Sequence, residues 1–125
     1  MHGNREDIPL RFQAGSSYSR DVAWGDMNVA FEAFPRGADT TPLFKGLPDD
    51  RCQCPHWGYI FKGKMRVTYA DREEVISAGE AFYIAPGHNV VVEEDCEVIE
   101  FSPKDEFQET VKIMAQNIAA MRRGR

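Results

Sequence analysis

Four side chains that commonly bind transition metals fall within a short part of the sequence. Cys52, Cys54 and His56 are spaced two residues apart, and His88 follows after a second strand-like stretch. Alternate residues of an extended chain point to the same side, so the first three would share one face. Two thiolates and two imidazoles form a tetrahedral donor set that zinc accepts. The sequence therefore predicts a metal site made by Cys52, Cys54, His56 and His88, with zinc expected first and iron second.

The spacing itself limits how many of these residues can hold one ion. Alternate Cα atoms of a strand lie roughly 6.5–7 Å apart, so a mononuclear site would use a subset, namely one of the two cysteines with His56 and His88. An iron site of two histidines and one carboxylate would need Glu100 or Glu32 as its third ligand. Two other interpretations stay open: a metal-free pocket in which the histidines contact a ligand, and purely structural roles.

These candidate ligands are carried by segments that have the pattern of short strands. Residues 27–34 alternate between two faces, and a break at Pro35 and Gly37 follows. Further strands are expected at 56–62, 65–70, 81–85, and 90–93 continuing to 98–101. Short strands separated by Gly, Asp and Pro, with no helical segment between them, are typical of an all-β sandwich or barrel.

The connections between the strands follow from their turn residues. Glycine tolerates the positive φ of a tight turn, so Lys62, Gly63 and Lys64 predict a hairpin. Residues 70–74 are expected to form the next turn, and 42–50 a loop. The first twenty residues have the composition of an arm or a loosely held strand.

A C-terminal helix is predicted at about 103–122. Ser102 is the expected N-cap and Pro103 the first helical residue, with Asp105 and Glu106 in the first turn. One apolar stripe then recurs at spacings of four and three residues. It consists of Phe107, Val111, Met114, Ile118 and Met121. The stripe either packs on the outside of the barrel or forms a two-helix seam between subunits.

The segment 56–62 carries aromatic side chains on the face opposite to His56. Trp57, Tyr59 and Phe61 alternate along it, whereas a strand with water on that side would be polar there. Such a face needs a cover, either the C-terminal helix or a second subunit. We therefore expect a homodimer.

Residues 44–102 resemble the cupin family. Gly63 matches the turn glycine of the first cupin motif, and Gly79 and Gly87 match the two glycines of the second. The ligand positions differ: His56 takes the place of the usual glutamate, and His88 precedes the usual histidine position by two residues. The positions of the two upstream histidines hold Asp50 and Cys52, while Ala85 and Val90 stand at the proline and histidine positions of the second motif.

The resemblance implies an all-β, cupin-type barrel, also called a double-stranded β-helix or jelly roll, with a C-terminal α-helix. Residues 1–125 would form a single domain with a barrel core at about 22–102. It also implies a small-molecule-binding protein whose barrel pocket is lined by His56, His88, Tyr83 and Phe31, with a metal site in the barrel. The alternatives are a metal-dependent dioxygenase, isomerase or lyase acting on a small oxygenated substrate, and an interaction module that uses the aromatic face and the helix stripe.

Composition narrows the partners further. The chain has 125 residues, of which 42% are hydrophobic and 28% charged, enough for one core. A net charge of −5 argues against a nucleic-acid partner, which would need a basic face. No apolar run is long enough for a membrane span and the first ten residues are too polar for a secretory signal, so we expect a cytoplasmic protein with no membrane partner. Three cysteines in such a protein do not suggest disulfides, and Cys96 is expected to be a packed thiol.

Overall fold

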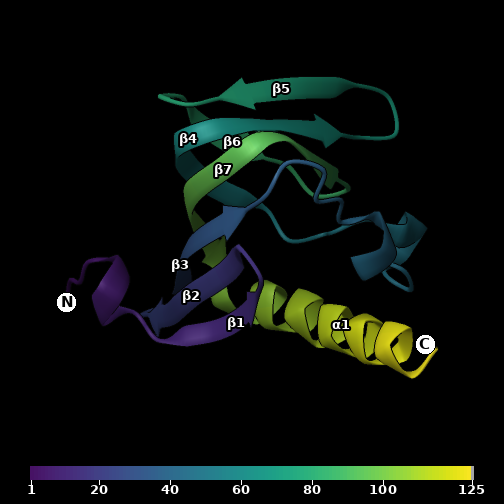
Figure 1. The fold of residues 1–125 in the computed structure, drawn as a ribbon, viewed down its shortest axis with the longest axis horizontal. Helices are drawn as coiled ribbons and strands as arrows, with labels where there is room; N and C mark the ends of the chain where they lie inside the picture. The colour runs from purple at the N-terminus through teal and green to yellow at the C-terminus, as the bar shows by residue number, and fades with distance from the viewer. Residues whose placement is uncertain (125) are drawn as a thin grey trace.

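The computed structural model describes residues 1–124 and is built around two long antiparallel strands, β4 (His56–Thr68) and β7 (Asn89–Pro103). These strands pair with each other along most of their length. The sheet order is β1-β2-β3-β7-β4-β5, and β6 pairs with β4 (Figure 1). The remaining strands are β1 (Leu10–Ala14), β2 (Ser17–Trp24), β3 (Met27–Phe34), β5 (Glu73–Ser77) and β6 (Ala81–Ile84). The sequence-based prediction of 27–34 as a strand is confirmed by β3.

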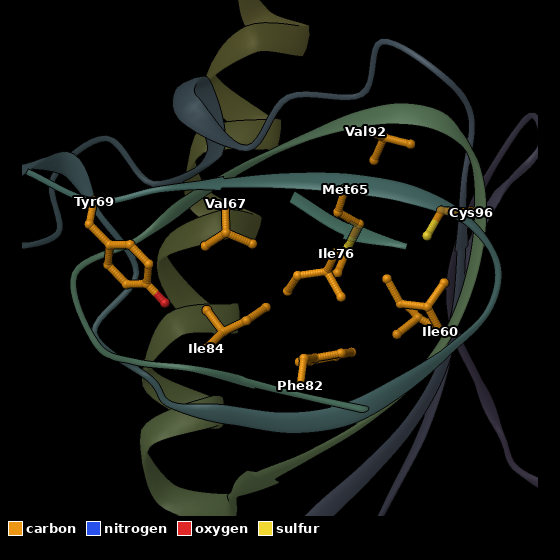
Figure 2. Close-up of a cluster of buried hydrophobic side chains, with 10 residues drawn as sticks. Ile60, Met65, Val67, Tyr69, Ile76, Phe82, Ile84, Val92 and Cys96 are labelled. Atoms are coloured by element: carbon orange, nitrogen blue, oxygen red, sulfur yellow. The ribbon is translucent and has the colours of Figure 1, made fainter. Parts of the chain in front are cut away.

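The sheet curls because β4 changes partners along its length. Its first residues pair with β6, its later residues pair with β5, and its register against β7 shifts between Ile60 and Met65. The interior that results is filled by buried side chains, and Figure 2 shows them pointing toward one another inside a ring of strands. They are Ile60, Met65, Val67, Tyr69, Ile76, Phe82, Ile84, Val92, Cys96 and Val98. Cys96 is thus a packed thiol, as predicted.

The predicted hairpin at Lys62, Gly63 and Lys64 is wrong, because β4 runs through these residues as one strand. The chain bulges here instead, with successive register shifts against β7. Gly63 has φ +92°, and a Cβ atom on it would lie 2.2 Å from the carbonyl oxygen of Asp95. Glycine is therefore required at this position by the bulge and by the close approach of β7, rather than by a turn.

Two other parts of the sheet also differ from the prediction. Glu73 and Glu74 were expected in a turn but begin β5, which pairs with β4 from Thr68 back to Lys64. Residues 10–20, expected to be an arm or a loosely held strand, form β1 and the first half of β2, which pair in a hairpin. The sheet therefore extends from Leu10.

The C-terminal helix α1 (Lys104–Arg123) begins one residue later than predicted. Pro103 is its N-cap, while Ser102 still belongs to β7. The first half of the apolar stripe packs within the chain, as Phe107, Val111 and Met114 contact the segment before β4. That segment contains the 3-10 helices η2 (Thr41–Leu43) and η3 (Pro48–Asp50), which lie beside α1 in Figure 1.

A further clamp fixes the helix on this segment. The Asn117 side-chain amide donates to the carbonyl oxygens of Leu43 and Lys45 at 2.7 and 2.8 Å. The helix therefore covers the end of the barrel that contains residues 43–54, and not the aromatic face of β4. The structure of residues 1–124 contains no helix with the length and apolar character of a membrane span.

Candidate metal site

Three of the four predicted metal ligands meet at one buried point. One potential ligand atom from each of Cys52, His56 and His88 lies within 4.8 Å of the other two. Cys52 and His88 are 1% exposed and His56 is 8% exposed. The Cys52 Sγ atom is 3.7 Å from Nε2 of His56, and the two imidazole rings meet edge to face with centroids 5.1 Å apart. The predicted combination of one cysteine with both histidines is the one that forms this cluster.

Backbone pairing brings the three residues together. The N–H of Cys52 donates to the carbonyl of His88 at 2.9 Å, and the N–H of His88 donates back at 3.2 Å. His56 begins β4, and β6 pairs with this part of β4. Gly87, with φ +92°, precedes His88 and turns the chain from β6 toward β7. Two ligands therefore sit on facing backbone segments, and the third enters from the adjoining strand end.

Each histidine ring is oriented by a hydrogen bond at Nδ1. His88 Nδ1 lies 2.7 Å from the carbonyl oxygen of Ala85. A carbonyl can only accept, so the neutral ring carries its proton on Nδ1 and leaves Nε2 with a free electron pair. His56 Nδ1 lies 2.6 Å from Ser102 Oγ. Partners of this kind, behind the ligands, fix ring orientation and tautomer in metal sites.

Burial sets the protonation states of the cluster. Desolvation lowers the pKa of His56 to about 4, with Glu32 acting in the opposite direction. The pKa of His88 also falls to about 4, through desolvation and the nearby His56. Burial raises the pKa of the Cys52 thiol to about 11. At neutral pH the cluster therefore holds two neutral imidazoles and one thiol, so it lacks the thiolate–imidazolium pair of a cysteine nucleophile.

The donor set and its spacing fit zinc. Zn–S and Zn–N bonds of about 2.3 and 2.1 Å at a tetrahedral angle place S and N about 3.6 Å apart. The observed separation between Cys52 Sγ and His56 Nε2 is 3.7 Å. Cys52, His56 and His88 would hold the ion, and zinc would draw the proton from the Cys52 thiol. Thr110 Oγ1, which lies 3.7 Å from Cys52 Sγ, adds a hydroxyl from the helix.

The ligand atoms that converge do not include the sulfur of the fourth predicted ligand, Cys54. Its thiol is buried in the same packed group as Cys52, with Phe44 and Phe107, and its Sγ atom is 3.5 Å from the carbonyl oxygen of Pro55. Burial raises its pKa to about 12. Residues 52–55 are not part of a strand, so the alternation that would have aligned the two cysteines does not apply to them.

The two aromatic residues expected to line the pocket lie on the outer face of the sheet. Tyr83 is 50% exposed, and its ring is 5.1 Å from that of Trp57. Phe31 stacks on Phe61 at 6.4 Å. The structure therefore brings His56 and His88 together but does not bring Tyr83 or Phe31 to them.

A buried acid pair lies close to His56. The side chains of Glu32 on β3 and Glu100 on β7 share a hydrogen bond, and burial followed by mutual repulsion raises the pKa of Glu32 well above its usual value. Burial also raises the pKa of Glu100. Ser19 Oγ donates to Glu32 Oε2 at 3.1 Å and receives a hydrogen bond from Arg11. Two carboxyls in contact cannot both ionise readily, so the pair holds a proton.

The positions of Glu100 and Ser102 near His56 could have been predicted from the sequence. Glu100 and Ser102 are two residues apart on one strand, so they share the face that looks toward His56. Cross-strand pairing places Glu100 opposite Ala30 and Gly58. No comparable signal marked the Ala85 carbonyl or Thr110, because both reach the cluster only through tertiary packing.

Comparisons with known proteins agree on the fold. No protein-family model matches the sequence, and no curated protein sequence matches it. Among solved structures, an RmlC-like cupin from Shewanella frigidimarina is similar with a TM-score of 0.58 and 15% identity, over 81% of this chain and 87% of that one. KdgF from Halomonas sp. gives 0.57 and 25%, over 80% and 90%.

A third similar structure is the polyketide cyclase RemF from Streptomyces resistomycificus. Its TM-score is 0.59 and its identity 17%, over 82% of this chain and 78% of that one. These likenesses and the antiparallel architecture confirm the predicted all-β barrel with a C-terminal helix. The chain is therefore a small protein of the cupin fold.

Proposed function

We propose that this cupin binds a divalent metal, zinc in the first place, through Cys52, His56 and His88. The observation that supports this proposal most strongly is the convergence of three ligand atoms within 4.8 Å in a buried position. Both rings are held through Nδ1, which leaves Nε2 for the ion. Buried sulfur and imidazole ligands of this kind favour zinc over magnesium or calcium.

Three protein ligands leave one position of a tetrahedral zinc ion for another group. Zinc sites that act on small molecules keep such a position open, whereas structural zinc sites close it with a fourth protein ligand. We therefore propose that a small oxygen-bearing ligand binds at the ion beside Thr110. The rest of the barrel interior is filled by the apolar cluster of Figure 2, which favours a compact ligand.

A second candidate, a metal-dependent enzyme acting on a small oxygenated substrate, is favoured by the acid pair. Glu32 and Glu100 hold a proton near His56, and buried groups with displaced pKa values are common at catalytic sites. A similar fold serves the polyketide cyclase RemF. In such an enzyme zinc would supply a Lewis acid, and the pair would hold a proton for transfer.

The test is metal analysis and zinc titration of protein purified without a histidine tag. We expect one zinc per chain, and we expect Cys52→Ser, His56→Ala and His88→Ala each to lower zinc affinity by more than about 100-fold. The double histidine variant should lose little more than either single variant, because ligands of one ion act as a unit.

Matched controls separate the site from general effects of substitution. Cys54→Ser and Cys96→Ser each remove a buried thiol outside the cluster, and His2→Ala removes an exposed histidine. These three variants should retain one zinc per chain. Folded His88→Ala protein with unchanged zinc affinity would refute the proposed site.

A further inference from the structure

A groove lies between α1 and the strands β1, β2 and β3, outside the proposed metal site. Its volume is about 510 Å³, within the range of roughly 300–1,000 Å³ that is usual for small-molecule sites. Residues 107–112 of α1 form one wall, and the start of the helix lies beside the β1–β2 hairpin in Figure 1. Cys52, His56 and His88 are not among the residues that line the groove. The groove is therefore a second candidate binding site, separate from the metal ligands.

A buried amide on β3 lines this groove and has an unused donor. Asn28 is 6% exposed, and its Nδ2 atom has no hydrogen-bond partner among residues 1–124. Its cross-strand neighbours do not supply one: Ala23 has no polar side-chain atom, and the hydroxyl of Ser102 is engaged with His56. A buried N–H group without a partner costs free energy, and native proteins satisfy nearly all of them. The missing acceptor would therefore come from a molecule in the groove.

The charged side chains of the groove favour an anion. Its lining contains two cations, Arg11 and Lys112, and one anion, Asp21. Arg11 and Asp21 form an ion pair, so the lining has one positive charge in excess. The whole chain carries a net charge of −5, which makes a positive groove a local exception. Such a local field attracts anionic ligands.

The chain holds Arg11 in place before any ligand binds. Its guanidinium donates to the carboxylate of Asp21 and, at 2.8 Å, to Ser19 Oγ. The guanidinium carbon also lies 5.3 Å from the ring centroid of Phe107 on α1. A guanidinium has more N–H donors than these two contacts use, so donors remain for a ligand. A side chain that is already ordered loses little conformational entropy on binding.

Apolar side chains from both walls complete the lining, among them Phe107 and Val111 of α1. Apolar surface gains free energy when a ligand removes it from water, so the groove suits an anion that also has an apolar part. We propose that the groove binds a small organic carboxylate. Its charged end accepts hydrogen bonds from Asn28 and Lys112, and its apolar body lies against Phe107 and Val111.

The experiment titrates benzoate into the zinc-loaded full chain and follows the backbone amide signals by NMR. We expect a Kd on the order of 1 mM, with the largest shift changes at Asn28 and at residues 107–112. Benzamide has the same ring without the charge, and acetate has the charge without the ring, so each should bind at least about 10-fold more weakly. His88→Ala lacks a proposed zinc ligand and should bind benzoate as the parent does. Failure of this proposal and failure of the metal site are therefore distinguishable.

A charge reversal on the helix wall tests the anion contact. Lys112 is exposed, so Lys112→Glu should keep the circular dichroism spectrum of the parent while benzoate affinity falls at least about 10-fold. Lys45→Glu makes the same change in net charge at an exposed lysine outside the groove. It should leave the affinity unchanged.

Asn28→Leu removes the unused donor and nearly keeps the size of the side chain. Benzoate affinity should fall about 10-fold. Without ligand, the midpoint temperature of thermal unfolding should equal or exceed that of the parent, because the variant no longer buries a donor without a partner. Absence of benzoate binding would overturn the proposal, as would shift changes confined to the proposed metal site. Unchanged affinity in either folded groove variant would also overturn it.

Discussion

The Oγ atom of Ser102 lies 2.6 Å from Nδ1 of His56, joining the end of β7 to the start of β4. Ser102 is 1% exposed, so water cannot easily take the place of its hydroxyl. The contact turns the imidazole so that Nε2 faces the thiol of Cys52. Ser102 is therefore a positioning residue for the proposed metal site.

Removing this hydroxyl should weaken metal binding without removing a ligand. We predict that Ser102→Ala lowers zinc affinity by about 10- to 100-fold, the usual cost of losing a partner behind a metal ligand. Ser102→Thr keeps a hydroxyl and should lose much less. Competition with a zinc chelator measures both affinities. Unchanged affinity in a folded Ser102→Ala variant would show that Ser102 does not position His56.

The buried histidines should make the metal-free protein sensitive to acid. Their pKa values fall to about 4 in the folded state, against about 6.5 when unfolded. The unfolded chain therefore binds protons first as the pH falls. The stability associated with each neutral ring is present above pH 6.5 and is lost as the pH falls toward 4.

The prediction for His88 is a difference in the slope of stability against pH. Each histidine contributes on the order of 3 kcal/mol across this window. His88→Gln should therefore flatten the curve between pH 6.5 and 4, with little change in slope above pH 7. Urea unfolding at a series of pH values, with a chelator present to remove metal, measures this slope for both proteins. Parallel curves for the parent and the variant would contradict a buried, neutral His88.

The acid pair should give the opposite dependence on pH. The pKa of Glu32 is raised in the folded state, so its contribution to stability is present at low pH and is lost as the pH rises through the folded value. Glu32→Gln mimics the protonated form and keeps a donor toward Glu100. We predict that it raises the free energy of unfolding at pH 8 and leaves it nearly unchanged at pH 4.

The exposed Glu109 on α1 provides the control for this substitution. Glu109→Gln removes the same charge from the surface and should change stability by less than about 0.5 kcal/mol at either pH. Equal effects of the two substitutions on the free energy of unfolding at pH 8 would show that the folded state does not raise the pKa of Glu32.

The bulge in β4 gives a prediction about two glycines. Gly63 and Gly46 have similar φ values, +92° and +97°, so alanine is strained at both. At Gly63 a Cβ atom would also meet the Asp95 carbonyl oxygen at 2.2 Å, whereas nothing lies within 4 Å at Gly46. Gly46→Ala should cost about 1–2 kcal/mol, and Gly63→Ala more than about 3. Thermal unfolding of the two variants measures this difference, and equal midpoint temperatures would contradict the close approach of β7 to Gly63.

The sequence predicted strand bounds best where a proline or glycine ends an apolar segment. Residues 27–34 end at Pro35, and β3 has these bounds, although its burial does not alternate because Asn28, Val29 and Ala30 are all buried. Residues 73–77 were missed as a strand because Glu73, Glu74 and Val75 are all exposed, which leaves almost no apolar pattern. Gly63 was placed in a turn because a glycine between two strand-like segments has the same local signature in a hairpin and in a bulge.

The site was predictable in part for similar reasons. Residue type and spacing indicated Cys52, His56 and His88 as ligands. The same alternation also placed Cys54 on their face, but alternation holds only for an extended chain, and residues 52–55 are not part of a strand. The contact between Cys52 and His88 depends on a backbone bridge between segments that are far apart in sequence. The position of Ser102 depended on where β7 ends, and Pro103 marked that boundary only to within one residue.

X-ray absorption at the zinc K-edge of the purified, zinc-loaded protein tests the central claim most directly. The proposed site predicts one sulfur at about 2.3 Å and two imidazole nitrogens at about 2.0–2.1 Å, with one further light atom. Cys52→Ser should remove the sulfur contribution, and Cys54→Ser should leave it in place. Two sulfur ligands, or a shell of nitrogen and oxygen alone, would contradict a site made by Cys52, His56 and His88.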